Sequence, residues 1–352
     1  MNGAAVLRVL VVDDSPFMRQ LVTRELERDG DIRVAGVACD GLEAVARVHE
    51  LCPDVVTMDV EMPRLDGLAA LARIMAERPT AVVMLSSLTA EAAEPTLRAL
   101  ELGAVDFVQK PDRGRSLDLS SIGLQLRQKV RGAARASLRR LAEPMPARPA
   151  ASPPRAALRR PLAAVCIGAS TGGPRAPAQL VPELGAALDA AVLIVQHMPA
   201  GFTGPFARRL HQAGSLRVKE AEDGDMAAAG LALLAPGGRH LEVASGGRVR
   251  LHDGPAVHGV RPSVDVMLRS AAAAFGRRCI AVVLTGMGED GAEGARSVKE
   301  HGGRVVAESA ETAVIYGMPR AVIERGLADE VLPLHRVAGA VQRAARALAA
   351  AA

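Results

Sequence analysis

The sequence predicts two α/β domains in tandem, each built on a doubly wound parallel sheet. Short apolar runs rich in β-branched residues alternate with helical patterns up to about residue 125, and the alternation resumes after residue 160. Parallel strands that are buried on both faces have this near-continuous apolar character, because helices cover both sides of the sheet. In such sheets the loops at the carboxyl ends of the strands form the functional edge.

The first predicted domain covers residues 6–125. Its expected strands are the runs LRVLVVDDS, IRVAGVA, DVVTMDV, AVVMLSS and DFVQK. Segments such as FMRQLVTRELERDG and GLEAVARVHELC separate these runs and are the expected helices. This order of elements predicts a parallel sheet whose strands all end at one edge.

The informative polar residues of the first domain fall at the ends of its expected strands. Asp13 and Asp14 end the first strand, Asp59 the third, Ser86 the fourth and Lys110 the fifth. Three carboxylates in one crevice repel one another unless a cation lies among them, and such open oxygen sites suit Mg²⁺. Each Asp alone is better explained as a strand-end turn or a helix cap, but the ordered set favours a phosphoryl site.

The motifs VVDDS, MDVEMPRLDG, MLSS and FVQKP closely resemble the receiver domain of two-component response regulators. The resemblance implies a receiver-type, flavodoxin-like fold in which Asp59 accepts a phosphoryl group from a histidine kinase, with Mg²⁺ as the cofactor. It also implies roles for five further residues: Asp13 and Asp14 bind the metal, Lys110 contacts the phosphoryl oxygens, and Ser86 and Phe107 are switch positions.

Residues 126–160 are predicted to form a basic linker between the domains. The stretch 129–160 contains nine Lys or Arg and one acidic residue, and its later half is rich in proline. Since the whole chain carries a net charge of +4, the rest of it is acidic. A nucleic-acid-binding tail is the alternative, but the segment has no interleaved aromatic residues for base stacking.

The second predicted domain covers residues 161–350. Its expected strands include AAVCIGAS, AAVLIVQHMP, GLALLAPGG and CIAVVLTGMGEDG. The first of these runs into GASTGGP, which has the G-x-S-x-G pattern of a nucleophile turn between a strand and a helix. A glycine loop that binds a phosphate is the alternative, but the G-x-G-x-x-G register and the GK[ST] of a P-loop are absent.

A nucleophilic serine at position 170 needs a base and an orienting carboxylate. His197 directly ends a strongly apolar strand, and Asp290 follows another one between two glycines. Asp265 is the competing acid, but it falls in an expected helix. The contexts of the other histidines are typical of helical or surface residues: His49, His211, His240, His252, His258, His301 and His335.

Six motifs together resemble the catalytic domain of chemotaxis-type protein-glutamate methylesterases: GASTGGP, VQHMPAGFT, LAPGGRHLEV, RPSVDVML, LTGMGEDGAEG and IYGMPRAV. The resemblance implies a second, Rossmann-like α/β domain in which Ser170 attacks methylated glutamates of chemoreceptors, assisted by His197 and Asp290 and without a cofactor. Thr171 and Met287 stand where the family supplies backbone contacts to the oxyanion. Members also commonly deamidate receptor glutamines, and a receiver before this domain is the family's full architecture.

Composition adds broad expectations. The chain has no long uncharged apolar run and no cleavable signal pattern, so we expect a cytoplasmic protein without membrane insertion. We also expect a monomer that binds no nucleic acid. The four cysteines lack metal-ligand spacing and are expected to be reduced packing residues. The rival functions are a DNA-binding response regulator, which lacks a visible helix-turn-helix, and a non-catalytic adaptor, which would not need a serine triad.

Overall fold

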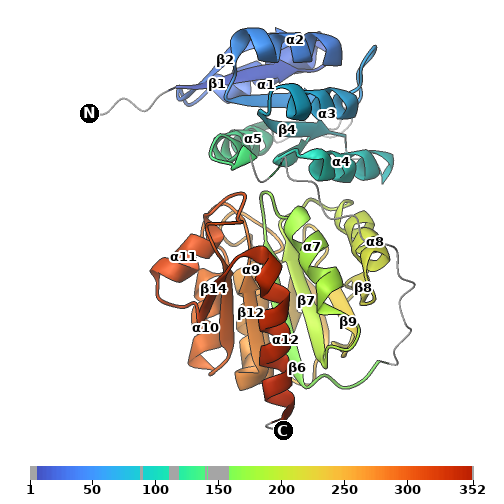
Figure 1. The fold of residues 1–352 in the computed structure, drawn as a ribbon, viewed down its shortest axis with the longest axis vertical. Helices are drawn as coiled ribbons and strands as arrows, with labels where there is room; N and C mark the ends of the chain where they lie inside the picture. The colour runs from blue at the N-terminus through green and yellow to red at the C-terminus, as the bar shows by residue number, and fades with distance from the viewer. Residues whose placement is uncertain (1–5, 88–89, 111–118, 139–140, 142–157, 351–352) are drawn as a thin grey trace. The chain divides into compact units, whose positions relative to one another are not determined.

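The computed structural model contains two compact units, which divide between Pro144 and Met145. It describes residues 6–87, 90–110, 119–138, 141 and 158–350. Each unit is a parallel α/β fold, as the sequence predicts (Figure 1).

The first unit holds a five-stranded parallel sheet in the order β2-β1-β3-β4-β5. Its strands are β1 (Leu7–Val12), β2 (Ile32–Ala38), β3 (Val55–Asp59), β4 (Ala81–Ser86) and β5 (Asp106–Gln109). Its helices are α1 (Pro16–Glu27), α2 (Gly41–Leu51), α3 (Gly67–Glu77), α4 (Ala90–Leu102) and α5 (Leu119–Ala133). Helices α1 and α5 pack together on one face, and α2, α3 and α4 follow one another on the other. The central strands β3 and β4 are buried along their whole length.

Side-chain caps begin three of these helices, each at the end of the loop that follows a strand. Ser15 accepts a hydrogen bond from the Met18 N–H, and Pro16 follows it in the first turn of α1. Asp40 accepts from two N–H groups at the start of α2, and Asp66 accepts from one at the start of α3. Because a cap replaces a missing intrahelical acceptor, each one fixes where the loop between strand and helix ends.

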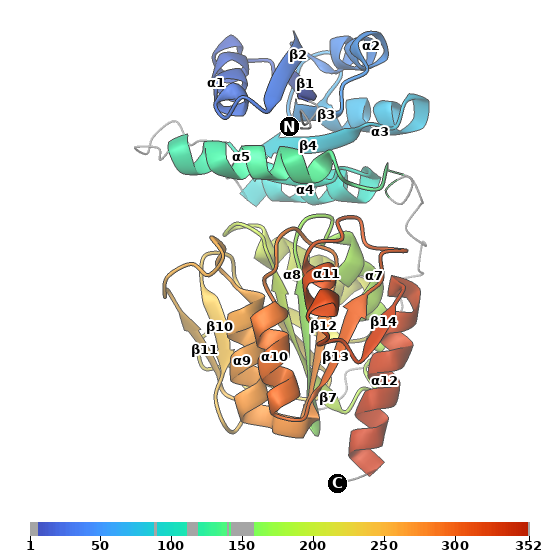
Figure 2. The ribbon, with the colours of Figure 1, turned by 90° about the vertical axis from the view of Figure 1, so that its left-hand side faces the viewer.

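The second unit holds a seven-stranded parallel sheet in the order β14-β13-β12-β6-β7-β9-β8. Its strands are β6 (Ala163–Ala169), β7 (Ala190–Gln196), β8 (Arg217–Glu220), β9 (Leu231–Leu234), β12 (Cys279–Val283), β13 (Arg304–Glu308) and β14 (Glu330–Leu332). Helices α7 (Arg175–Leu184), α8 (Thr203–Ala213) and α12 (Leu334–Ala350) lie together on one side of the sheet. Helices α9 (Val264–Phe275), α10 (Ala292–Glu300) and α11 (Met318–Glu324) lie on the other, as Figure 2 shows for α10 and α12.

An antiparallel hairpin of β10 (His240–Val243) and β11 (Val249–His252) packs against α9. A short 3-10 helix, Gly276–Arg278, joins α9 to β12. The centre of the sheet is the best-buried part of the unit, since β6, β7 and β12 are buried throughout. Cys166 and Cys279 are free and buried there, whereas Cys52 is exposed at the end of α2, so it is not a packing residue.

The linker does not begin at residue 126, because α5 continues to Ala133. Arg127 and Arg131 of this helix form ion pairs with Asp29, at 2.9 and 2.7 Å, and Arg131 also pairs with Asp31 at 2.7 Å. Part of the charge that suggested a basic linker therefore neutralises acidic residues after α1. Residues 142–157 of the expected linker lie outside the described residues.

Candidate functional site

The three candidate catalytic residues follow neighbouring strands at the carboxyl edge of the second sheet. Ser170 follows β6, His197 follows β7 on one side of it, and Asp290 lies in the loop after β12 on the other side (Figure 1). The main chain joins the three loops, since the His197 N–H donates to Ala169 and the Ser170 N–H donates to Thr285, both at 3.0 Å. The parallel sheet therefore brings together residues that are 120 positions apart in the sequence.

His197 and Asp290 form a nearly buried pair. The Nε2 atom of His197 lies 2.8 Å from Oδ2 of Asp290, and their side chains are 10% and 2% exposed. Among the described residues, no hydrogen bond joins the Ser170 hydroxyl to this pair. Because Nε2 is used by the carboxylate, Nδ1 is the ring nitrogen that remains to accept a proton.

Asp290 is held by the N-terminus of α9 as well as by the histidine. Its Oδ1 accepts from the Ser263 hydroxyl at 2.8 Å and from the Asp265 N–H at 2.9 Å, and its Oδ2 accepts from the Val264 N–H at 2.7 Å. Burial raises the pKa of Asp290, but the hydrogen bond and charge of His197 and these backbone donors outweigh it and hold the pKa below its usual value. The group is thus fixed as a carboxylate at a helix N-terminus.

Asp265, the competing acid, has a different task in the structure. It is fully buried in the first turn of α9, where its Oδ1 accepts from the N–H groups of Gly291 and Gly294 at 2.9 and 2.7 Å. Its Oδ2 lies 3.0 Å from Nε2 of His258. Asp290 therefore binds the start of α9 while Asp265 binds the start of α10, and this exchange fixes the loop that carries Asp290.

Two backbone N–H groups beside the serine have no acceptor among the described residues: those of Thr171 and Met287. The carbonyl groups of the same peptides are each bonded twice. The Ser170 carbonyl accepts from the Gly173 N–H at 2.7 Å and from Gln196 at 2.9 Å, and the Gly286 carbonyl accepts from Gly317 and Met318. The two peptides are thus held in fixed orientations.

The candidate phosphorylation site lies at the carboxyl edge of the first sheet. Asp59 ends β3, and Asp13 and Asp14 follow β1. Lys110, directly after β5, places its Nζ 2.7 Å from Asp13 and 2.6 Å from Asp59. Burial raises the pKa of Asp59 to about 6, assisted by the charge of Asp13 and opposed by Lys110 and by the backbone of Glu61.

The donor set of this acidic pocket fits a divalent cation. Asp13, Asp14 and Asp59 each offer a carboxylate oxygen within 4.8 Å of the others. Hard oxygen ligands of this kind are those that Mg²⁺ takes, usually with several waters retained. One positive charge from Lys110 leaves the cluster with excess negative charge, so a metal would lower the cost of keeping Asp59 ionised.

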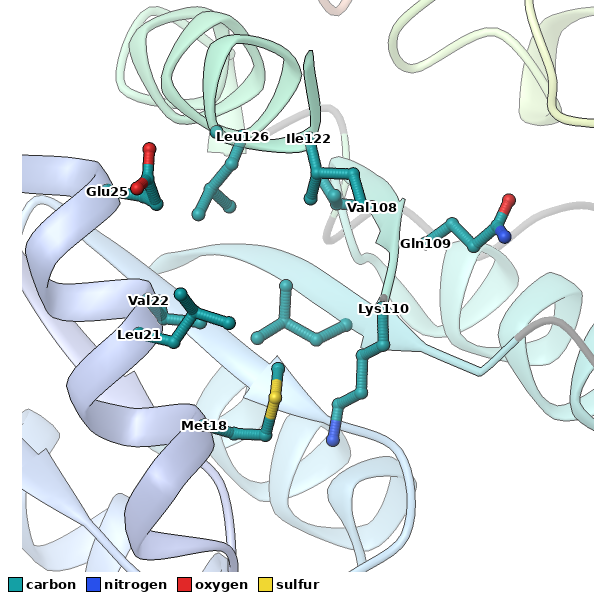
Figure 3. Close-up of a pocket in the computed structure, with 11 residues that line it drawn as sticks. Met18, Leu21, Val22, Glu25, Val108, Gln109, Lys110, Ile122 and Leu126 are labelled. Carbon is teal, nitrogen blue, oxygen red and sulfur yellow. The ribbon is translucent and has the colours of Figure 1, made fainter. Parts of the chain in front are cut away.

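Apolar side chains pack against the stem of Lys110 where it extends toward the acidic pocket. A small cavity of about 30 Å³ lies between α1 and α5 over the end of the sheet, and the stem of Lys110 lines it together with Met18, Leu21, Ile122 and other apolar residues (Figure 3). Only 17% of the lysine side chain is exposed. The packed methylene stem aims the ammonium group at the carboxylates.

The two expected switch residues are buried beside the pocket. Ser86 ends β4 and accepts a hydrogen bond from the Thr96 hydroxyl at 2.6 Å. Phe107 lies on β5 with 2% of its surface exposed, and the Lys129 ammonium group lies 5.1 Å from the centre of its ring. Thr96 and Lys129, which the sequence did not suggest, therefore hold these two residues in place.

Comparison with known proteins places both regions in one family. Residues 165–341 match the CheB methylesterase family, and residues 9–119 match the response regulator receiver domain. A protein-glutamate methylesterase/protein-glutamine glutaminase from Symbiobacterium thermophilum is 49% identical over 350 residues, which cover 96% of this chain and 97% of the relative. A relative of the same name from Thermotoga maritima is 46% identical over 338 residues, covering 94% and 96%.

The chain belongs to the CheB methylesterase family. The crystal structure of the Thermotoga maritima CheB methylesterase catalytic domain is similar to the second unit, with 45% identity and a TM-score of 0.50, over 51% of this chain and 97% of that one. The second unit is thus a CheB-type parallel α/β fold and not the helix-turn-helix domain that the DNA-binding alternative requires. No helix in the described part of the chain has both the length and the apolarity to cross a bilayer.

Several residues that support the CheB site were missed at the sequence level. His240 looked like a surface residue, but it is 1% exposed; burial lowers its pKa, opposed by a hydrogen bond to the Pro255 carbonyl. Its Nδ1 accepts from the Ser263 N–H at 3.2 Å, so it positions the residue that donates to Asp290. The motif RPSVDVML contained the signal for Ser263, since a serine before an apolar helical run is typical of a helix N-terminus.

Proposed function

We propose that this chain is a phosphorylation-controlled serine esterase that demethylates glutamate methyl esters on chemoreceptors and deamidates specific glutamines there. The observation that carries the proposal is the His197–Asp290 pair beside Ser170, at one edge of a CheB-type sheet. The names of the relatives support the substrate, since they give both the methylesterase and the glutaminase activity. The proposal places the reaction in the cytoplasm.

The proposed chemistry proceeds through an acyl-enzyme. The Ser170 hydroxyl attacks the γ-carbonyl of the substrate while Nδ1 of His197 takes its proton, and Asp290 stabilises the imidazolium. The histidine then returns the proton to the leaving group, which departs as methanol from an ester or as ammonia from an amide. A water activated by the same nitrogen hydrolyses the acyl-enzyme and leaves a glutamate carboxylate. No cofactor is needed for these steps.

The oxyanion of each tetrahedral intermediate would bind the free N–H groups of Thr171 and Met287. Removing one such donor from a comparable site costs about 3 kcal/mol of transition-state stabilisation. Both groups belong to peptides whose carbonyls are already bonded, so they need not reorganise when the negative charge develops.

The receiver would control this reaction through Asp59. Its carboxylate attacks the phosphorus of a phosphorylated histidine kinase or of a small phosphodonor, while Lys110 contacts the phosphoryl oxygens. Mg²⁺ held by Asp13, Asp14 and Asp59 would neutralise charge on those oxygens when bound. Ser86 and Phe107 would change position in response, and phosphorylation would raise the rate of the esterase reaction.

The test measures methanol release from methylated receptor membranes, with and without a small phosphodonor. Ser170→Ala is expected to lower the rate of methanol release by a factor of about 10³ or more, while the receiver still takes up phosphate. Asp59→Asn is expected to keep the basal rate and lose the response to the phosphodonor. Wild-type turnover in Ser170→Ala would refute the catalytic assignment, and a retained response in Asp59→Asn would refute the switch. Labelling by a serine-directed probe separates the enzyme from a non-catalytic adaptor.

A further inference from the structure

A buried glutamine side chain joins the main chains of the nucleophile and the base. Gln196 is the last residue of β7 and is 1% exposed. Its Nε2 donates to the Ser170 carbonyl at 2.9 Å and lies 3.5 Å from the His197 carbonyl. A single amide group therefore spans the two loops whose side chains must meet in the reaction.

The hydrogen bond to Ser170 fixes the direction of the next N–H. In a trans peptide the carbonyl and the following N–H point in opposite directions. The Ser170 carbonyl faces Gln196 and the Gly173 N–H, so the Thr171 N–H points away from them. Losing the Gln196 bond leaves only one donor on this carbonyl and allows the peptide to rotate.

The surroundings of Gln196 are shaped for its amide group. A Cβ atom at Gly173 would collide with the Ser170 carbonyl and with the amide of Gln196, so only glycine leaves the required space. The Oε1 atom of Gln196 is buried and has no hydrogen-bond partner among the described residues. Burying an unpaired amide oxygen is unfavourable, so stability of the core alone does not explain a glutamine here.

Backbone N–H groups hold the carbonyl of the other oxyanion peptide, with no side-chain donor among the described residues. The Gly286 carbonyl accepts from the Gly317 and Met318 N–H groups, at 3.0 and 2.8 Å, where α11 begins. This explains the glycine of IYGMP, since a Cβ at Gly317 would lie 2.6 Å from that carbonyl. In the described part of the chain, the carbonyl on the Met287 side is thus held by backbone donors, whereas the carbonyl on the Thr171 side also depends on the side chain of Gln196.

We propose that Gln196 is a positioning residue for acyl transfer, which holds the Ser170–Thr171 peptide so that the Thr171 N–H faces the developing oxyanion. Gln196 does not touch the substrate and transfers no proton. The inference rests on the proposed catalytic role of Ser170. It assigns to one side chain the orientation of half of the oxyanion site.

The first test replaces the amide by an apolar side chain of similar length in the full-length protein. Gln196→Met is expected to lower kcat for methanol release by about 10- to 100-fold, because one oxyanion donor is misplaced but not removed. KM is expected to change less than about threefold, since the contact is realised in the transition state. The assay uses methylated receptor membranes with saturating phosphodonor.

A second glutamine provides the matched control. Gln342 in α12 also donates its Nε2 to two backbone carbonyls, those of Glu183 and Leu184 at 2.8 and 3.2 Å, at the end of α7. Gln342→Met removes the same kind of hydrogen bond away from Ser170 and is expected to keep kcat within twofold of wild type. An equal loss of kcat in both variants would overturn the positioning role.

The Gln196→Glu variant gives a readout that a merely structural role would not produce. A protonated carboxyl group can donate its O–H to the Ser170 carbonyl, whereas a carboxylate cannot and would repel that oxygen. The ratio of variant to wild-type kcat is therefore expected to fall as pH rises through the pKa of the new group. A ratio independent of pH would contradict the proposal, and this test decides the matter if Gln196→Met does not fold.

The outcomes separate this inference from the proposed function. If Ser170→Ala is inactive and Gln196→Met has the wild-type kcat, the positioning role is wrong and the serine mechanism stands. If Ser170→Ala retains turnover, the serine mechanism itself is wrong. A loss of kcat in Gln196→Met, with unchanged KM and a pH-dependent Gln196→Glu ratio, supports the proposal.

Discussion

The two domains each place a buried aspartate beyond or at the end of a central parallel strand, but they hold the two carboxylates in opposite ways. Asp59 lies beside Asp13, and burial raises its pKa to about 6 despite Lys110. Asp290 is buried even more deeply, yet its pKa is lowered, because a histidine and the N-terminus of α9 donate to it.

This difference shows that the sheet edge and the neighbouring groups make separate contributions to each site. The edge determines where a polar residue is placed, and the neighbouring groups determine its chemistry. A carboxylate in a cluster with excess negative charge, such as Asp59, is suited to bind a metal and to receive a phosphoryl group. A carboxylate whose oxygens already accept several hydrogen bonds, such as Asp290, is suited to orient a base. Replacing the carboxylate by an amide should therefore remove an unfavourable charge at position 59 and a favourable one at position 290.

Asp290→Asn is expected to produce the largest effect. An amide in place of the carboxylate can leave the geometry intact but favours the wrong histidine tautomer, and the same change in a serine protease triad lowers kcat about 10⁴-fold. We expect a fall of about 10³- to 10⁴-fold in methanol release. The control is phosphate uptake by the receiver, which should be unchanged; a variant with more than a tenth of wild-type kcat would contradict the role of Asp290.

Asp59→Asn is expected to stabilise the metal-free receiver. Because the folded pKa of about 6 lies above the ordinary value of 3.8, the ionised group opposes folding. The penalty is absent below pH 4, grows between pH 4 and 6, and is complete above pH 6. Two units of pKa correspond to about 3 kcal/mol, so the neutral amide should gain up to that amount at pH 7.

Hydrogen exchange of receiver peptides in the full-length protein, followed from pH 5 to 8 with a chelator present, measures this gain. Added Mg²⁺ should slow exchange in the wild-type receiver more than in Asp59→Asn, because only the wild type keeps all three carboxylates. If the variant exchanges faster than the wild type at pH 7, then the carboxylate of Asp59 stabilises the fold and the comparison with Asp290 fails.

The comparison also shows which parts of the two sites the sequence could predict. Residues at strand ends, such as Asp59 and His197, were predictable because apolar runs mark the strands and parallel strands end at one edge. The roles of His240 and Gln196 were not predictable, because their contacts exist only in the folded chain. The β10–β11 hairpin brings His240 to the site, and the pairing of β7 with β6 brings Gln196 to the Ser170 carbonyl. Local context favoured Asp290 over Asp265, and in the structure Asp290 is the one that pairs with His197, but the exchange of hydrogen bonds between the starts of α9 and α10 has no local signal.

The linker boundary at residue 125 was wrong for a related reason. A run of Arg and Lys without an apolar stripe resembles an unstructured segment when it is considered alone. In the structure Arg127 and Arg131 face Asp29 and Asp31, some 100 positions earlier, and these ion pairs lie on α5. Charges whose partners are distant in sequence cannot be distinguished from a solvated linker by composition.

Ser263→Ala is the smallest change that we expect to resolve, and it tests how Asp290 is held. Among the described residues, the hydroxyl is one of four donors to this carboxylate, beside the His197 ring and two backbone N–H groups. Its loss removes a hydrogen bond to a charged group, worth about 1.5–3 kcal/mol in general, but three donors remain. We therefore expect kcat to fall about 3- to 10-fold.

The pH dependence of unfolding gives an independent check on the same substitution. A lowered pKa means that Asp290 contributes stability above its ordinary value of 3.8, and that this contribution is lost as pH falls through the folded pKa. With one donor removed, the folded pKa should move back toward 3.8. The stability difference between wild type and Ser263→Ala should thus be present at neutral pH and shrink in acid. A difference that stays constant down to pH 3 would mean that Ser263 supports the helix start and not the carboxylate.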